Sequence, residues 1–319
     1  MNDIRIAAAQ FENRNGDKDY NLFVIDELSR KAAEKGAQVI CFHEQSVTGY
    51  TFLKDLTKEQ LTELAEPIPS GSSTRQLIKI AAKNNIVILA GILEKENDKI
   101  YKATVCVDGS GMKAKFRKLH PFINPHISPG NEYVFFDLFG WTCSILICYD
   151  NNVIENVRAV TLMGAQILFA PHVTMCTPSP MPGRGFVDPA LWENREKDPV
   201  ALRLEFDGPK GRRWLLRWLP ARAYDNGIYI VFSNPIGMDG DQLKNGNSLV
   251  LDPFGEIIAE VRNFDNDFAI GVCTEEKLTR AGGYRYRNAR RPDLYKHILS
   301  QPHDSVVKPV WMDKQYEGQ

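Results

Sequence analysis

The chain has 319 residues, with 39 Lys and Arg against 40 Asp and Glu, so its formal net charge is -1. Hydrophobic residues make up 43% and charged residues 25% of the chain, values that are typical of globular proteins and exclude a disordered, collagen-like or coiled-coil chain. The balanced charge argues against nucleic-acid binding, because nucleic-acid binders usually carry a basic excess. The composition therefore predicts a globular protein with no nucleic-acid partner.

The N-terminal residues lead directly into a strand-like stretch, so we expect no secretory signal. No apolar run reaches the length of about 18 residues that a membrane-spanning helix needs, so we expect no membrane partner. The cysteines are scattered without a Cys-x-x-Cys pair: Cys41, Cys106, Cys143, Cys148, Cys176 and Cys273. This pattern favours neither a zinc site nor a disulfide framework. We expect a cytoplasmic protein that needs no metal and no cofactor.

Strand-like and helical patterns alternate along the chain. Apolar runs predict strands over residues 4–10, 38–42, 86–91, 100–107, 112–117, 141–148, 167–171, 228–233, 247–251 and 256–260. Apolar residues at helical spacing predict helices over 19–34, 57–65, 72–84 and 152–163. The turn at 108–111, with two glycines, predicts a hairpin between two of the strands. No segment has the composition of an interdomain linker, so residues 1–319 are expected to form one α/β domain.

Two segments interrupt this alternation. Residues 174–211 are rich in Pro, Gly, Arg and Trp, and we expect an inserted loop there. A connection of this length is often a functional lid, but a segment that packs on a neighbouring subunit would have the same composition, and the sequence leaves both open. The tail over 284–319 is polar and aromatic, and we expect it to wrap around the body or a partner subunit.

Three reactive side chains follow the ends of predicted strands. Glu44 follows the strand over 38–42, Lys118 follows the strand over 112–117, and Cys148 ends the strand over 141–148. In α/β folds, reactive groups gather at the carboxyl ends of strands. A thiol is a weak nucleophile until it loses its proton, which a carboxylate can accept and a nearby ammonium favours. The three residues therefore predict a base, a cation and a nucleophile in one site.

The segments around these residues carry a resemblance to a known family. In chain order they are AAAQF, FHEQSVTGY around Glu44, FRKLHPF around Lys118, SPGNE, ILICYD around Cys148, GAQILFAPH, ARAYDNGIYIVFSNPIG and GNSLVLDPFGEIIAE. Their order and spacing resemble the nitrilase superfamily of carbon–nitrogen hydrolases, from residue 5 to about 275. The resemblance implies a four-layer α-β-β-α sandwich, a catalytic Glu44-Lys118-Cys148 triad, and a homodimer or higher homo-oligomer.

The family chemistry gives the neighbouring residues candidate roles. The backbone N–H of Tyr149 would join Lys118 in an oxyanion hole, which stabilises the charge that develops during acyl transfer. Many members carry a second Glu between the triad Lys and the Pro-Gly pair, but residues 120–130 contain no acid. By its spacing, His126 stands closest to that position, and it would position substrate or share proton transfers. Asn152 would line the pocket or cap the next helix, and His172 is a further candidate for substrate contact or proton transfer.

The residues after the nucleophile bear on the substrate. Nitrilases typically have Cys-Trp-Glu there, whereas this chain has Cys148, Tyr149 and Asp150. We therefore expect hydrolysis of a small amide through a cysteine thioester. The alternatives are a nitrilase or an N-carbamoyl amide hydrolase that uses the same triad, and, from another class, a non-enzymatic binding module on the same fold.

Overall fold

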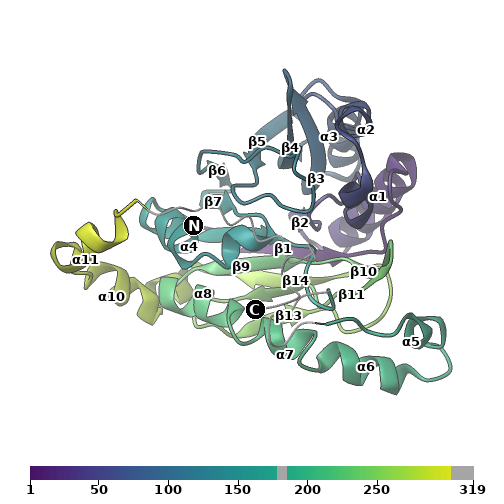
Figure 1. The fold of residues 1–319 in the computed structure, drawn as a ribbon. Helices are drawn as coiled ribbons and strands as arrows, with labels where there is room; N and C mark the ends of the chain where they lie inside the picture. Colours follow the sequence, from purple (N-terminus) through teal and green to yellow (C-terminus); the bar gives the residue numbers. More distant parts are fainter. Residues whose placement is uncertain (178–184, 303–319) are drawn as a thin grey trace.

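The computed structural model describes residues 1–177 and 185–302 and contains two six-stranded sheets (Figure 1). The first sheet has the order β14-β1-β2-β3-β4-β5. Its strands span, in that order, Asp267–Cys273, Ile4–Gln10, Val39–Cys41, Val87–Glu96, Lys99–Asp108 and Gly111–Arg117. The second sheet has the order β13-β12-β9-β8-β7-β6. Its strands span Ile257–Glu260, Leu249–Leu251, Tyr229–Ser233, Ile167–Pro171, Trp141–Ile145 and Phe135–Leu138.

The two sheets pack face to face around a common core. Along β1, Ile6 and Ala8 lie in the core shared with the second sheet, whereas Ala7 and Ala9 lie in a separate core beneath the outer helices. This division follows from the strand geometry, in which successive side chains point to opposite faces. Because the centre of β1 is covered on both faces, residues 6–9 form a continuous apolar run.

Helices cover the outer face of each sheet. Helices α1 (Lys18–Glu34) and α3 (Ser72–Asn84) pack on the first sheet, and α4 (Ile154–Leu162) and α8 (Leu219–Asn226) cover the second (Figure 1). The short helices η1 (Thr51–Asp55) and α2 (Lys58–Leu64) pack at the edge of the first sheet, and η2 (Cys148–Asn151) follows β7. The chain thus forms the four-layer α-β-β-α sandwich that the motifs imply.

The inserted segment expected over 174–211 contains two helices. Residues 178–184 lie outside the described residues, but α5 (Pro189–Glu193) and α6 (Pro199–Asp207) follow, and α7 (Arg212–Leu215) begins directly after the segment. Both α5 and α6 begin with a proline behind an Asp cap, a helix-start signal that the sequence carried. The rings of Trp192 and Phe206 pack against Phe264 of the same chain.

The C-terminal region is largely helical. Helices α9 (Glu275–Arg280) and α10 (Gly282–Asn288) lead into α11 (Pro292–Leu299), and α10 packs on α8. Figure 1 shows α10 and α11 extending away from the body, and α11 has no buried residue. Residues 303–319 of the predicted tail lie outside the described residues. A small hairpin of β10 (Ile236–Asp239) and β11 (Gln242–Asn245) completes the fold. Within the described ranges, none of the helices has the length and apolar character to cross a membrane.

Strand direction places the ends of several strands at common edges. In the first sheet, β2 and β3 are parallel and β4 and β5 each reverse direction, so β5 runs parallel to β2. In the second sheet, β7 and β8 are parallel. The segments that follow β2 and β5 therefore leave the first sheet at one edge, and those that follow β7 and β8 leave the second sheet together. All of the predicted triad residues lie in these segments.

Candidate active site

The turn after β2 positions Glu44 by packing closely on β3. The Glu44 side chain is 1% exposed, and its backbone N–H donates to the carbonyl of His172 at 3.3 Å. A Cβ on Gly91 of β3 would lie only 2.2 Å from the backbone nitrogen of Gln45. This close approach requires glycine at position 91. The Val47 N–H then donates to the Gly91 carbonyl at 3.0 Å, so the turn is fixed on both sides of Glu44.

Lys118 is held by backbone contacts at the end of β5. Its N–H donates to the Lys102 carbonyl at 2.9 Å, and its own carbonyl accepts from the Gly130 N–H at 2.8 Å. A Cβ on Gly130 would lie 2.4 Å from the Arg117 carbonyl oxygen. The Pro-Gly pair after the loop therefore packs directly against the backbone that carries Lys118, which explains why glycine is needed there.

Glu44 and Lys118 form a buried ion pair. The Lys118 Nζ donates to Glu44 Oε1 at 2.7 Å, and neither side chain is more than 1% exposed. Burial by itself lowers the pKa of Lys118, but the charges of Cys148, Glu44 and Asp150 outweigh it and raise the pKa above its usual value. Lys118 is therefore an ammonium at neutral pH. Glu44 Oε2 is buried and has no hydrogen-bond partner in the described part of the chain.

Cys148 occupies the sharp turn between β7 and η2. Its backbone φ is 52°, a left-handed value that is uncommon for any residue other than glycine and clusters at functional sites. The residue is 5% exposed, and its Sγ lies 3.6 Å from the Val173 carbonyl oxygen. Since Glu44 binds the carbonyl of His172, the predicted base and nucleophile contact consecutive residues of the segment after β8.

Asp150 connects the turn at Cys148 to the loop after Lys118. Its fully buried carboxylate accepts from the backbone N–H groups of Leu119 at 3.2 Å and His120 at 2.9 Å. It also contacts His120 Nδ1 at 2.9 Å and accepts from the Ile147 N–H at 3.2 Å. The local sequence carries no signal for this connecting role of Asp150. Together, Asp150 and the segment after β8 bring Glu44, Lys118 and Cys148 to one place.

The Tyr149 N–H is placed as an oxyanion-hole donor would be, directly after the nucleophile. Within residues 1–177 and 185–302, this N–H donates to no backbone carbonyl, so it is available to an oxygen of a bound molecule. The Tyr149 ring packs edge-on against the rings of His120 and Phe122, with centroids 6.1 and 6.0 Å apart. These contacts attach the turn to the loop that carries Lys118.

His172 is buried and supports the turn at Cys148. Its Nε2 lies 3.1 Å from Asn151 Nδ2, which also donates to the Leu146 carbonyl at 2.7 Å. The imidazole packs on the Phe232 ring at a centroid distance of 4.8 Å. His172 thus contacts the turn at Cys148 through its side chain and the backbone of Glu44 through its carbonyl. Both contacts hold candidate site residues in place.

Asn152 is half-buried at the end of η2. Its carbonyl accepts from Arg222 at 3.1 Å, which links the turn after Cys148 to α8. The cap of α4 is Val153, without a side-chain hydrogen bond. The helix-capping alternative for Asn152 is therefore wrong, and its role as a pocket residue stays a prediction.

His126 is not buried as the triad residues are, and its role beside them stays a prediction. The residue is exposed, and its backbone N–H donates to Asn124 Oδ1 at 2.9 Å. A hydrogen bond of Glu59 to its own backbone and one to Thr57 lower the pKa of the Glu59 carboxyl in α2. The charge of His126 contributes to the same shift. The Asn124 amide in turn binds η1 through the Leu53 carbonyl at 2.8 Å. This loop is thus anchored to η1, and the centre of its Phe122 ring lies 4.8 Å from Lys118 Nζ.

A second buried lysine lies beside Glu44. Lys102 of β4 has a side-chain exposure of 0%, and its Nζ lies 3.6 Å from Glu44 Oε1. The Nζ also donates to the Phe122 carbonyl at 3.2 Å and lies 4.0 Å from the centre of the Tyr50 ring. Burial lowers the pKa of Lys102 to about 7, although the charge of Glu44 opposes this shift. The sequence did carry a signal for Lys102, because a lysine inside the apolar strand predicted over 100–107 is unusual.

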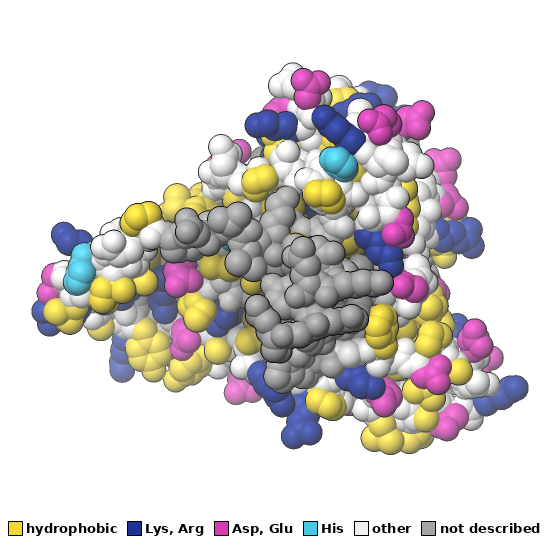
Figure 2. Space-filling model, in the orientation of Figure 1, with side chains coloured by type: hydrophobic (Ala, Val, Ile, Leu, Met, Phe, Trp, Pro, Cys, Tyr) yellow, Lys and Arg dark blue, Asp and Glu magenta, His cyan; other side chains and the backbone are white. Residues whose placement is uncertain are grey.

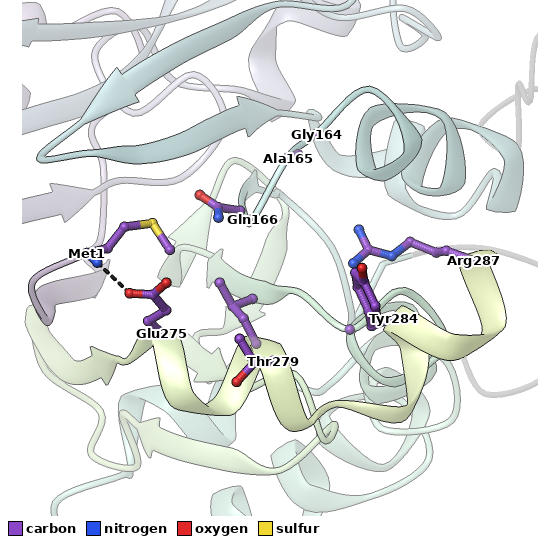
Figure 3. A pocket seen from close by; sticks show the side chains of 10 residues that line it. Met1, Gly164, Ala165, Gln166, Glu275, Thr279, Tyr284 and Arg287 are labelled. Atoms are coloured by element: carbon purple, nitrogen blue, oxygen red, sulfur yellow. Dashed lines mark hydrogen bonds and ion pairs between the residues drawn. The ribbon is translucent and has the colours of Figure 1, made fainter.

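The cavity shown in Figure 3 lies away from these residues. It has a volume of about 510 Å³ and is lined by Met1, Gln166, Glu275, Thr279, Tyr284, Arg287 and neighbouring residues. Gln166 directly precedes β8, whereas His172 directly follows it, so the cavity and the triad lie at opposite ends of this strand. Within the described residues, no three His, Cys, Asp or Glu side chains are grouped in a way that could hold a metal ion.

The comparisons with known proteins agree with this geometry. The family model described as carbon-nitrogen hydrolase matches residues 5–280. A nitrilase of Pyrococcus abyssi is 26% identical, over 91% of this chain and 94% of its own length. A 2-oxoglutaramate amidase of Bacillus subtilis is 29% identical, over 80% of this chain and 85% of its own. An amidase from Nesterenkonia sp. AN1, solved in complex with acrylamide, shares the fold with a TM-score of 0.68 and 22% identity, over 93% of this chain and 97% of its own. The chain therefore belongs to the carbon–nitrogen hydrolase family, as its motifs predict.

Proposed function

We propose that this carbon–nitrogen hydrolase cleaves small amides through a thioester on Cys148. One observation carries the proposal: the buried Lys118 ammonium binds Oε1 of Glu44 at 2.7 Å, which leaves Oε2 to act as the base. In the described part of the chain, this second oxygen has no hydrogen-bond partner. Family membership favours an enzyme over the binding-module alternative.

The first half-reaction forms the thioester and releases the amine. Glu44 Oε2 accepts the proton of the Cys148 thiol, and the sulfur attacks the amide carbon. The carbonyl oxygen becomes an oxyanion, which the Lys118 ammonium and the Tyr149 N–H stabilise. When the C–N bond breaks, the proton held by Glu44 passes to the leaving nitrogen. The products of this step are a neutral ammonia or amine and an acyl group on the sulfur.

The second half-reaction repeats this chemistry with water. Glu44 accepts a proton from the attacking water, the oxyanion forms between the same donors, and the C–S bond breaks. The sulfur leaves as a thiolate and recovers its proton from Glu44, and the acid product departs. Splitting the hydrolysis in this way replaces one difficult step by two easier ones.

Amides are the favoured substrates for two reasons. The nucleophile is followed by Tyr149 and Asp150, not by the Trp-Glu pair typical of nitrilases. In addition, relatives over most of the chain include an (R)-stereoselective amidase of Pseudomonas sp. and the 2-oxoglutaramate amidase of Bacillus subtilis. The relatives also include a nitrilase and N-carbamoylputrescine amidases, so nitriles and N-carbamoyl amines belong in the test.

The test is ammonia release from matched sets of small amides, N-carbamoyl amines and nitriles. The proposal predicts turnover of at least one amide, with kcat/KM above that of the nitrile carrying the same acyl group. Loss of ammonia release in Cys148→Ala would assign the activity to this site. Preferential turnover of nitriles or of N-carbamoyl amines would contradict the amide assignment and identify the alternative.

We also propose that the enzyme is a cytoplasmic homodimer or higher homo-oligomer. Large apolar side chains are exposed on and beside α4, among them Ile154, Leu162 and Met163, and Figure 2 shows further hydrophobic side chains along the projecting α10 and α11. A second copy of the chain would cover such surfaces. Light scattering after size-exclusion chromatography measures the assembly, and a monomer at micromolar concentration would contradict it. Cell fractionation tests the location, which the scattered cysteine pattern supports.

A further inference from the structure

Two buried lysine side chains share one carboxylate oxygen at the centre of the site. Glu44 Oε1 lies 2.7 Å from Lys118 Nζ and 3.6 Å from Lys102 Nζ, and all three side chains are at most 1% exposed. The family mechanism outlined above uses only Lys118. Lys102 is therefore a buried charged group, in contact with the proposed base, for which that mechanism has no role.

A second cluster on the same sheet shows what a balanced arrangement looks like. Glu94 also faces two cations, Lys115 and Arg117, but Arg117 pairs in addition with Glu96 at 2.8 Å. Two carboxylates there face two cations. Among the described residues, Lys102 and Lys118 both pair with Glu44, and the charge of the buried Asp150 carboxylate also acts on Lys118. Glu44 is the only described carboxylate that pairs with Lys102, and Lys118 holds it more closely.

A buried ammonium that shares its only paired carboxylate is costly, and this cost is relieved in one of two ways. Either one ammonium loses its proton, or a new negative charge forms nearby. The groups that face Lys102 are the carboxylate of Glu44, the ammonium of Lys118, the Phe122 carbonyl and the ring of Tyr50. The remaining charge that acts on it is that of Cys148, which acts on Lys118 as well. A thiolate at Cys148 would stabilise the ammonium form of both lysines.

We propose that Lys102 stores the proton of Cys148 during the reaction and so acts as a positioning residue for proton transfer through Glu44. This inference rests on the proposed amide hydrolysis and deepens it. Before attack, Lys102 is a neutral amine. The thiol proton passes through the Glu44 carboxylate to Lys102 Nζ, where an N–H bond forms as the S–H bond breaks. The cluster then holds two ammonium groups, the carboxylates of Glu44 and Asp150 and one thiolate, and its net charge is unchanged because the proton has only moved within it.

The stored proton also serves the leaving group. When the tetrahedral intermediate collapses, Lys102 returns its proton through Glu44 to the departing nitrogen, and Lys102 is again a neutral amine. In this way Glu44 is a carboxylate at the moment of attack. Lys102 and Glu44 together carry out the proton transfers that a second glutamate would share, since residues 120–130 contain no acid. The burial that lowers the pKa of Lys102 to about 7 supports this role, since such a group gains and loses a proton near neutral pH.

The test measures the pH dependence of Cys148 alkylation by iodoacetamide in the intact enzyme and in three variants. Lys102→Gln removes the charge but keeps a donor for the Phe122 carbonyl. Lys102→Arg keeps a cation that cannot release its proton. Lys115→Gln is the matched control, because it also removes one of two cations from a buried glutamate. Adduct formation is followed on the Cys148 peptide by mass spectrometry.

For Lys102→Gln we expect the midpoint of the alkylation profile to move to higher pH by about one unit, because the thiolate loses a nearby cation. Lys102→Arg should move the midpoint to lower pH, because its cation is permanent. It should also lose about 100-fold or more in kcat for an amide, because its proton cannot be passed on. Lys115→Gln should match the wild type in both. A wild-type profile in folded Lys102→Gln, or wild-type turnover in Lys102→Arg, would overturn the proposal.

If Lys102→Gln does not fold, the turnover of Lys102→Arg decides the question by itself. Alkylation requires no amide substrate, so the two proposals fail separately. A shifted profile in an enzyme that hydrolyses no amide would contradict the proposed function and support the coupling of Lys102 to Cys148. An unshifted profile in an active amidase would contradict the role of Lys102 alone.

Discussion

The carboxylate of Asp150 binds His120 twice, through the backbone N–H and through Nδ1, both at 2.9 Å. Asp150 lies two residues after the proposed nucleophile, and His120 lies two residues after Lys118. This contact therefore fixes the distance between two catalytic segments that come from different sheets. Because the carboxylate also accepts from the Leu119 N–H at 3.2 Å, it satisfies donors that the loop could not otherwise pair in a buried place.

Asp150→Asn should disturb this junction. An Asn side chain has one acceptor oxygen and an NH₂ group, which would face backbone N–H donors. We expect the free energy of unfolding to fall by about 1–3 kcal/mol and kcat to fall as Lys118 moves away from Glu44. Urea unfolding and amide turnover measure the two effects. Asp137→Asn, which changes an acceptor in an exposed turn at Gly140, is the control and should stay within about 0.5 kcal/mol. Equal stability of the two variants would contradict the account.

Lys118→Met should abolish most of the activity. The substitution keeps much of the side-chain volume but removes the ammonium that binds Glu44 and faces the developing oxyanion. Loss of one oxyanion-hole donor typically costs about 100- to 1000-fold in kcat, and we expect at least this loss in steady-state ammonia release. Lys115→Met removes a cation from the Glu94 cluster on the same strand and should retain activity. A loss below about tenfold for Lys118→Met would reduce Lys118 to a structural ion-pair residue.

The sequence pointed to the candidate reactive residues but not to the residues that arrange them. Glu44, Lys118 and Cys148 could be predicted because they follow strand ends within recognisable motifs. Asp150, Lys102 and the carbonyl of His172 act through contacts between segments that are distant in the chain, and periodicity carries no information on such contacts. The loop over residues 120–130 shows the same limit: spacing placed His126 near the missing acid, but the Asn124 amide ties this loop to η1 and His126 is exposed.

The fold was predicted best where the sequence pattern is regular. The helix expected over 72–84 matches α3 (Ser72–Asn84), and the expected hairpin matches β4 and β5. The strands β6, β10, β11 and β14 were missed, because they are short or only partly buried and their side chains follow local packing more than a regular pattern. Composition alone suggested a loop after residue 174, whereas the Asp-Pro helix starts of α5 and α6 decided the local structure.

His126→Ala should leave the enzyme unchanged. The imidazole is exposed and lies beside Glu59, so its removal takes no group from the buried site. We expect the same kcat/KM, the same pH profile and a stability change below about 0.5 kcal/mol. The measurement is the initial rate from about pH 5.5 to about pH 9, which covers the usual pKa of a histidine and the pKa of Lys102. A selective loss of acylation rate in this variant would restore the proton-transfer role that the sequence suggested.

The buried Lys102 should make stability depend on pH. Its pKa is about 7 in the folded chain, below the usual 10.5, so between these pH values the unfolded chain binds more protons than the folded chain. The free energy of unfolding should therefore rise with pH across this window, by at most about 1.4 kcal/mol per pH unit. The Cys148→Ala background removes the thiolate, and Cys148→Ala/Lys102→Gln is its control. From about pH 7 to about pH 9, the lower part of that window, the Tm of Cys148→Ala should rise relative to the Tm of the double variant. A Tm difference that stays constant over this range would contradict a neutral Lys102.

The central claim is that turnover passes through an acyl group on the Cys148 sulfur. Enzyme mixed with an amide substrate and quenched with acid within one turnover should gain the mass of the acyl group, located on the peptide that contains Cys148 and released by hydroxylamine. Cys148→Ala should form no adduct and release no ammonia, while remaining folded by circular dichroism. Ammonia release by Cys148→Ala, or an acyl group on a different residue during turnover, would contradict the account.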